Sequence, residues 1–98
     1  MTITKKQNGT ALEVALEGRL DTVTAPELEA ELKTSLQDAE SLVFDFSKLD
    51  YISSAGLRVL LSAHKIMSAK GGMKVTHVNE IVQEVFEVTG FCDILNIE

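Results

Sequence analysis

Residues 42–60 read LVFDFSKLDYISSAGLRVL, and this stretch sets the pattern for the whole chain. It begins with Leu42–Phe46, a short β-prone run that is apolar on both faces except at Asp45, as in a central strand covered on both sides. A connection over residues 47–52 leads to Ser53-Ser54, which opens a helix. The apolar positions of this helix are spaced three and four residues apart: Leu57, Leu60, Leu61, His64 and Met67. We therefore expect a buried strand that feeds directly into a helix.

The segment before this stretch predicts two strands and a helix. Residues 2–6 form a candidate edge strand, and Asn8-Gly9 marks a tight turn. Leu12, Val14 and Leu16 then alternate with less apolar residues, as in a half-buried strand that ends at Gly18.

The first helix is expected over residues 25–37. Thr24 and Glu27 have the spacing of a capping box, and Pro26 suits a first helical turn. Its apolar stripe consists of Leu28, Leu32 and Leu36.

The segment after this stretch predicts one more strand and one more helix. Gly71-Gly72 ends the second helix, and Met73–Val78 forms the next strand. Asn79 caps a third helix, which ends near Gly90. The side chains expected to face inward from it are Ile81, Val82, Val85 and Phe86. A short strand or turn then closes the chain with Ile94, Leu95 and Ile97.

Strands that alternate with helices indicate an α/β fold with a partly parallel sheet. We expect one domain over residues 1–98, built on a four- to five-stranded mixed sheet with helices mainly on one face. Hydrophobic residues make up 45% of the chain and charged residues 24%, which is typical of a globular domain.

The formal net charge of -6 argues against nucleic acid and anionic membranes as partners, because both bind positive surfaces. A partner with a basic docking face fits better. The polar segment Met1–Thr10 lacks the apolar run of a signal peptide, and no stretch reaches the roughly 18 apolar residues of a membrane span. A single cysteine, Cys92, forms no disulfide within the chain. We expect a cytoplasmic protein without direct membrane insertion.

The start of the second helix is the most informative candidate site. A hydroxyl at Ser54 lies among free backbone N–H groups at the positive end of the helix dipole, a place that holds phosphate well. Gly56 lacks a Cβ and lets another chain come close. Serine is also a common helix N-cap, and spacing alone favours plain capping. Asp45 is interpreted as a strand-end carboxylate that caps loop N–H groups.

Enzymatic and metal-binding functions find no support in the sequence. Ile52 stands where the Gly-x-Ser-x-Gly elbow needs its first glycine, and no histidine is placed to act as base for Ser54. His64 and His77 lie on different elements without a second ligand at metal spacing. We expect no catalysis, no metal and no cofactor.

The segment Tyr51–Leu60 resembles the signature of STAS domains, the family of sulphate-transporter and anti-sigma-factor-antagonist domains. The family pattern is an apolar pair followed by Asp-Ser-Ser/Thr-Gly-Leu. Further landmarks follow in order along the chain: Gly18-Arg19-Leu20-Asp21, Ala25-Pro26, Asp45-Phe46-Ser47, Gly71-Gly72 and Thr89-Gly90-Phe91. The resemblance covers essentially the whole chain and implies the STAS-type fold.

The resemblance also implies a function. In bacterial antagonists of this family, a kinase-type anti-sigma factor phosphorylates the first serine of the signature, and a serine phosphatase removes the phosphate. That serine corresponds to Ser54, and Asp21 matches an acid at the kinase-facing surface. Two positions depart from the pattern: Ser53 replaces the usual Asp, and Ala55 replaces the second Ser/Thr. Ser53 is a second candidate acceptor, ranked below Ser54.

We thus expect an anti-sigma factor antagonist that releases a sigma factor until Ser54 is phosphorylated. The residues expected at the partner surface are Asp21, Ser53, Ser54, Gly56 and Arg58. STAS domains also act as non-phosphorylated binding subunits of lipid-transport ABC complexes or of sensory complexes. Ser53 and Ala55 keep that alternative open.

Overall fold

The computed structural model describes all residues, 1–98, and its elements follow the predicted order. The strands are β1 (Thr2–Asn8), β2 (Ala11–Leu20), β3 (Ser41–Ile52), β4 (Met73–Thr76) and β5 (Asn96–Ile97). The helices are α1 (Ala25–Ser35), α2 (Ser54–Ser68), α3 (Glu80–Thr89) and the short 3-10 helix η1 (Phe91–Asp93).

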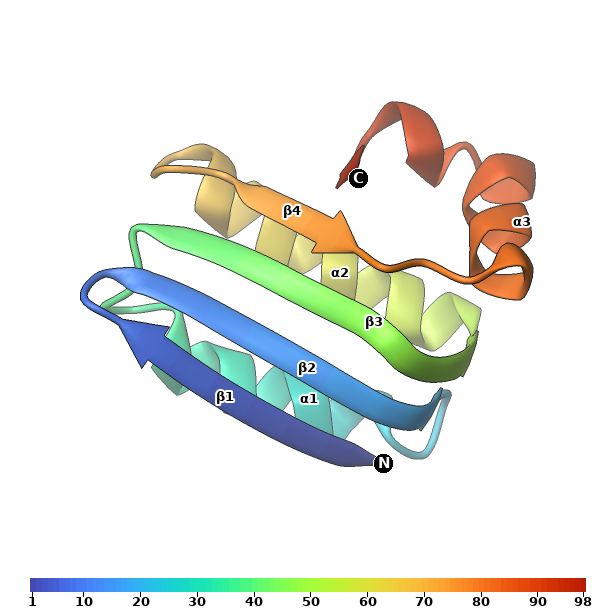
Figure 1. Cartoon of the computed structure of the whole chain (residues 1–98), viewed down its shortest axis with the longest axis horizontal. Helices are drawn as coiled ribbons and strands as arrows, with labels where there is room; N and C mark the ends of the chain where they lie inside the picture. Colours follow the sequence, from blue (N-terminus) through green and yellow to red (C-terminus); the bar gives the residue numbers. More distant parts are fainter.

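The five strands form one mixed sheet in the order β1-β2-β3-β4-β5. β1 and β2 are an antiparallel hairpin turning at Gly9, whose φ is 66°, and all other neighbours are parallel. Helices α1 and α2 lie side by side on one face of the sheet, and α3 packs beside the C-terminal end of β3 (Figure 1). The predicted α/β fold, with a mixed sheet and helices mainly on one face, is confirmed.

The core lies between the sheet and the helices. It contains 24 buried apolar residues and no buried polar or charged residue, so any chemistry of this domain takes place at its surface. Phe44 and Phe46 point from β3 into this layer with ring centroids 5.6 Å apart. The predicted stripe of α1 is confirmed, since Leu28, Leu32 and Leu36 are all buried.

Three strands are longer than predicted: β1 ends at Asn8 and not at residue 6, and the larger differences are in β2 and β3. β2 continues through Gly18 to Leu20, and β3 includes residues 47–52, which we expected to be a connection. The parallel register shifts between Ala15 and Glu17 and again between Gly18 and Arg19. Such a bulge breaks the simple alternation of side chains while pairing continues, and Gly18 tolerates its φ of 105°. Because the alternation is broken there, the sequence pattern did not predict these extensions of β2 and β3.

The helix starts and ends also differ in part from prediction. α1 ends at Ser35, and Thr24 forms no capping box: its hydroxyl donates to the Arg19 carbonyl (2.8 Å) and accepts from the Asp21 N–H (2.9 Å). β4 ends at Thr76, short of the predicted Val78, because His77 has a left-handed φ of 58°.

The predicted caps of α3 are confirmed. Asn79 accepts from the Val82 N–H (2.8 Å), and Gly90 has a φ of 80°. Ile81, by contrast, was wrongly predicted to face inward, and 58% of it is exposed because α3 buries only one narrow face. On α2, Leu61 and His64 are only partly buried, and the true core face includes Val59 and Ala63.

Lys70 joins the end of the α2 segment to the end of α1. Its ammonium donates to the carbonyls of Leu36 (2.6 Å), Ala39 (3.0 Å) and Gln37 (3.2 Å). These carbonyls lie just after α1, where the helix dipole is negative and backbone acceptors lack helical partners. One cation therefore holds the loop between α1 and β3 in place.

We expect Lys70→Met to lower the free energy of unfolding by about 1–3 kcal/mol, because three carbonyls lose a charged donor. Urea unfolding measures the change. The matched control is Lys65→Met on the exposed side of α2, with an expected change within about 0.5 kcal/mol. Equal effects of the two substitutions would contradict a specific role for Lys70.

Candidate functional site

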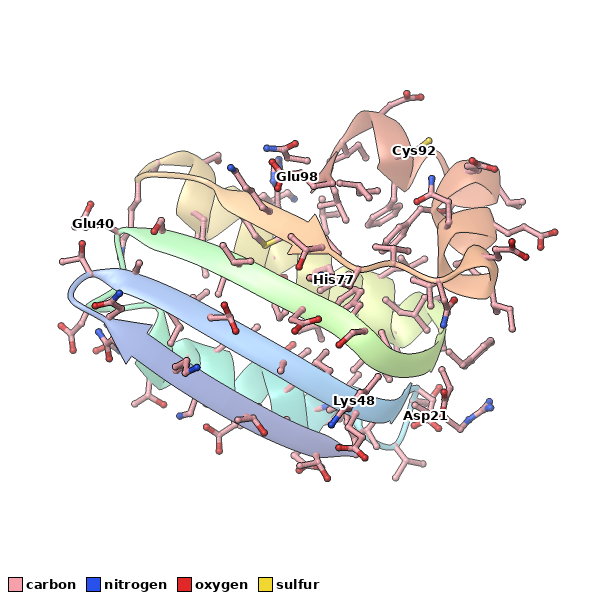
Figure 2. The ribbon with its side chains drawn as sticks, in the orientation of Figure 1. Asp21, Glu40, Lys48, His77, Cys92 and Glu98 are labelled. Atoms are coloured by element: carbon pink, nitrogen blue, oxygen red, sulfur yellow. The ribbon has the colours of Figure 1, made fainter.

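The candidate site forms where β2 and β3 end at the same edge of the sheet. Both strands run parallel, so the loop after β2 and the start of α2 emerge side by side. The Ser53 N–H donates to the Leu20 carbonyl (2.9 Å) and joins the two segments directly. Figure 2 shows Asp21 at this edge of the molecule.

The two serines have different roles. Ser53 is the N-cap of α2 with an extended backbone, and its Oγ accepts from the Gly56 N–H at 3.5 Å. Ser54 is the first helical residue; it is exposed, and its hydroxyl has no hydrogen-bond partner within the chain. The capping role that the sequence left open for Ser54 therefore belongs to Ser53, and the Ser54 hydroxyl is free.

Asp21 organises the loop beside Ser54. Its Oδ1 accepts from the backbone N–H groups of Val23 (3.0 Å) and Thr24 (3.1 Å). These bonds, above all the one from Thr24, together with nearby Arg19, hold the pKa of Asp21 below its usual value. The Arg19 guanidinium in turn lies 4.5 Å from the centre of the Tyr51 ring. The loop therefore presents a fixed negative charge.

Gly56 is buried beneath the site. A Cβ at this position would lie 2.7 Å from Leu20 Cγ and 2.9 Å from Ile52 Cγ1. Its missing side chain therefore lets α2 pack closely on β2 and β3, whereas the sequence had suggested room for a partner. Arg58, by contrast, is exposed and lines a shallow hollow with Thr22 of the Asp21 loop.

The comparisons with known proteins agree with this geometry. The STAS domain model matches residues 2–98. The chain belongs to the STAS domain family. BtrV of Bordetella bronchiseptica, named as a candidate anti-sigma factor antagonist, is 40% identical over 84 residues, which are 84% of this chain and 72% of BtrV. The anti-sigma-B factor antagonist of Bacillus subtilis is 29% identical over 94% of this chain and 85% of its own length.

Solved structures show the same STAS fold. An anti-sigma factor antagonist from Mycobacterium paratuberculosis superposes with a TM-score of 0.89 at 24% identity, over 98% of this chain and 83% of that one. SpoIIAA in its unphosphorylated form superposes with a TM-score of 0.77 at 15% identity, over 99% of this chain and 87% of its own. At these identities the likeness concerns the fold alone.

Two further polar residues of this STAS domain meet on the open face of the sheet. Asp45 Oδ1 accepts from the Ser47 N–H (2.9 Å), as predicted for a capping carboxylate, although Asp45 lies within β3 and not at its end. This bond, followed by contact with His77, lowers the pKa of Asp45. His77 Nδ1 lies 3.3 Å from the same oxygen. The sequence missed this pair because Asp45 lies on β3 and His77 directly follows β4, and only the β3–β4 register, which pairs Asp45 with Thr76, brings the two side chains together.

The remaining candidates lie elsewhere. His64 is on α2, and Cys92 is a free, partly buried thiol in η1. The last 24 residues, 75–98, contain five acidic residues and no Lys or Arg, so the negative charge is concentrated around α3 and the C-terminus. No helix of the domain has the length and apolar character needed to cross a membrane.

We expect Gly56→Ala to lower the free energy of unfolding by about 1–3 kcal/mol, because the new methyl group overlaps two core side chains. Thermal or urea unfolding measures it. Ser62→Ala, at an exposed position of the same helix, is the control and should be neutral within about 0.5 kcal/mol. A neutral Gly56→Ala would contradict close packing at this point.

The charge of Asp21 should stabilise the domain in a pH-dependent way. Asp21→Asn keeps an acceptor oxygen for the loop N–H groups but removes the charge. Because folding lowers the pKa of Asp21, its contribution is present above its unfolded pKa of about 3.9 and is lost as the pH falls through the lower folded value. The stability difference between wild type and Asp21→Asn should therefore shrink toward pH 3 in urea unfolding. A difference that is constant from pH 7 to pH 3 would show that the charge plays no part.

Proposed function

We propose that this STAS domain is an anti-sigma factor antagonist that binds a kinase-type anti-sigma factor and thereby releases a sigma factor. Phosphorylation of Ser54 by that kinase switches the antagonist off, and a serine phosphatase restores it. The observation that carries the proposal is the exposed, unpartnered hydroxyl of Ser54 in the first turn of α2. The names of the relatives support the class of partner.

The position of Ser54 suits a reversible phosphate. A phosphate adds about -1.5 to -2 charges at pH 7, and a helix N-terminus stabilises such a charge through its free N–H groups and its dipole. Ser54 is outside the core, so the modification leaves the fold intact. The effect falls on the partner, which would have to accommodate a bulky, strongly hydrated group at the docking surface.

The departures from the family pattern are compatible with this role. Serine and aspartate are both good N-caps, and Ser53 does cap α2. The replacement of the usual Asp thus keeps the cap and removes one negative charge next to the acceptor. Because the Ser53 hydroxyl is already engaged with Gly56, Ser54 is the better acceptor.

The partner surface we propose comprises Asp21, Ser53, Ser54 and Arg58, all at the edge where β2 and β3 end. Gly56 supports this surface from below by allowing α2 to pack closely. The fixed carboxylate of Asp21 and the acidic balance of the chain favour a partner with a basic docking face. The function is one of binding, since the surface offers Ser54 no adjacent base.

The decisive test uses wild type, Ser54→Ala, Ser54→Asp and Ser53→Ala. Each kinase-type anti-sigma factor of the organism is purified and tested singly, with ATP, by mass spectrometry and calorimetry. Wild type and Ser53→Ala should gain one phosphate, and Ser54→Ala should gain none and keep binding. Ser54→Asp should bind more weakly; a loss of even ~3 kcal/mol reduces affinity more than a hundredfold.

Other outcomes discriminate between the alternatives. Phosphate on Ser54→Ala but not on Ser53→Ala would place the acceptor at Ser53. Tight binding without any phosphate on the wild type would remove the switch and keep the antagonist. Absence of binding to every such kinase would favour the non-phosphorylated subunit of a lipid-transport or sensory complex.

A further inference from the structure

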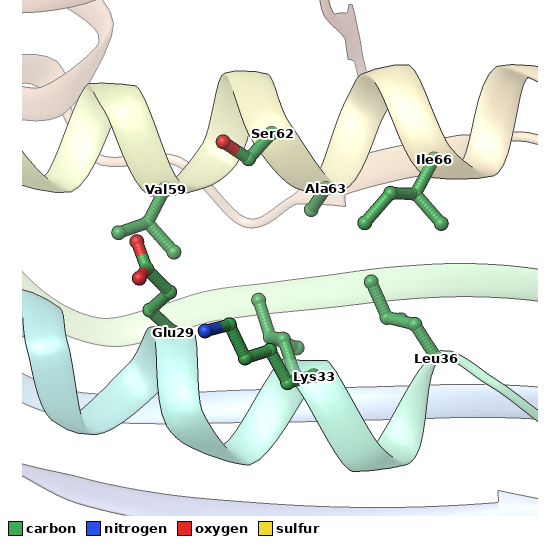
Figure 3. A pocket seen from close by; sticks show the side chains of 8 residues that line it. Glu29, Lys33, Leu36, Val59, Ser62, Ala63 and Ile66 are labelled. Atoms are coloured by element: carbon green, nitrogen blue, oxygen red, sulfur yellow. The ribbon is translucent and has the colours of Figure 1, made fainter.

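A groove runs between α1 and α2 on the outer side of the helix layer (Figure 3). Its volume is about 240 Å³. Most of its lining is apolar: Leu32 and Leu36 from α1, and Val59, Ala63 and Ile66 from α2. Glu29, Lys33 and Ser62 form the polar rim.

Small residues on α2 keep the groove open. Ala63 is almost fully buried at its floor, and exposed Ser62 stands at its mouth. Ile66, opposite Leu36 in Figure 3, is 47% exposed although it is a large apolar residue. An open apolar groove with a polar rim has the character of a pocket for an apolar side chain.

The groove continues into the candidate site. Glu29 and Val59 line both the groove and the shallow hollow that contains Ala55 and Arg58. That hollow also includes Thr22 of the Asp21 loop. A protein that covers Ser54 and the Asp21 loop therefore lies directly at the entrance of the groove.

We propose that the α1–α2 groove takes a large apolar side chain of the anti-sigma factor that docks over Ser54. This inference rests on the proposed function and adds a second contact to it, remote from the phosphorylated serine. The volume suits one such side chain, since a cavity of about 150 Å³ holds a benzene ring. It is too small for a whole helix, and its two rim charges, Glu29 and Lys33, are of opposite sign and therefore do not favour an ionic ligand.

The groove therefore supplies affinity and partner choice, while Ser54 supplies the switch. An apolar anchor buried in a pocket contributes more to binding than the polar contacts around it. Phosphorylation at the other end of the surface then opposes this contact without altering the groove.

The test fills the groove and leaves Ser54 untouched. Ser62→Trp places a large ring at the mouth of the groove, and Ser68→Trp makes the same change at an exposed position of α2 that lines a different hollow, next to β4. As a second pair, Ile66→Ser removes an apolar wall, and Ile94→Ser makes the same change at a residue of similar exposure (47% and 45%). Circular dichroism confirms folding, and calorimetry measures binding to the purified kinase-type anti-sigma factor that binds the wild type.

Ser62→Trp and Ile66→Ser should each weaken binding by about tenfold or more, and their controls should stay within about twofold of wild type. If both groove variants bind like wild type while Ser54→Asp binds weakly, the groove inference is overturned and the proposed function stands. If wild type binds no such kinase, both fail together. A second copy of this chain as the occupant would appear as a dimer in sedimentation that Ser62→Trp dissociates, and that result would also overturn the inference.

Discussion

β2 and β3 run parallel, and the Ser53 N–H donates to the Leu20 carbonyl where the two strands end. The other features of the site depend on this pairing. It places the start of α2 next to the loop that follows β2, although the two segments are separated by some thirty residues of sequence. It also fixes the direction in which α2 leaves the sheet, so that Ser54, the first helical residue, is exposed while Gly56 and Leu57 are buried. An exposed Ser54 beside an ordered Asp21 loop is the consequence.

The close approach of α2 to the sheet depends on Gly56, where a side chain would overlap Leu20 and Ile52. At the other end of the helix layer, Lys70 satisfies three carbonyls after α1. The helix layer is thus held at both ends, by apolar packing near the site and by a charged donor far from it. Between these ends α1 and α2 separate enough to leave the groove lined by Val59 and Ile66.

The division between a wholly apolar interior and a polar surface suits the binding function that we propose for this small domain. A buried polar site needs surrounding groups to satisfy it, and a chain of 98 residues has little room for both a core and an enclosed cleft. The features that this domain can use to bind a partner are therefore surface charges, a free hydroxyl and shallow hollows. The two adjacent serines have separate roles: Ser53 caps the N-terminus of α2, and the hydroxyl of Ser54 stays free.

The sequence by itself determined the order of the elements, the α/β class, the buried stripe of α1 and the Asn79 and Gly90 caps of α3, because these depend on local periodicity and on contacts within a few residues. It also singled out the start of α2. Only the tertiary structure decided which serine caps the helix, that the Asp21 carboxylate accepts hydrogen bonds from its own loop, and that Gly56 faces the core. It also extended β2 and β3 through a bulge, and it brought Asp45 to His77 and Lys70 to the end of α1. Each of these depends on register or packing between distant segments, which residue spacing along one chain does not encode.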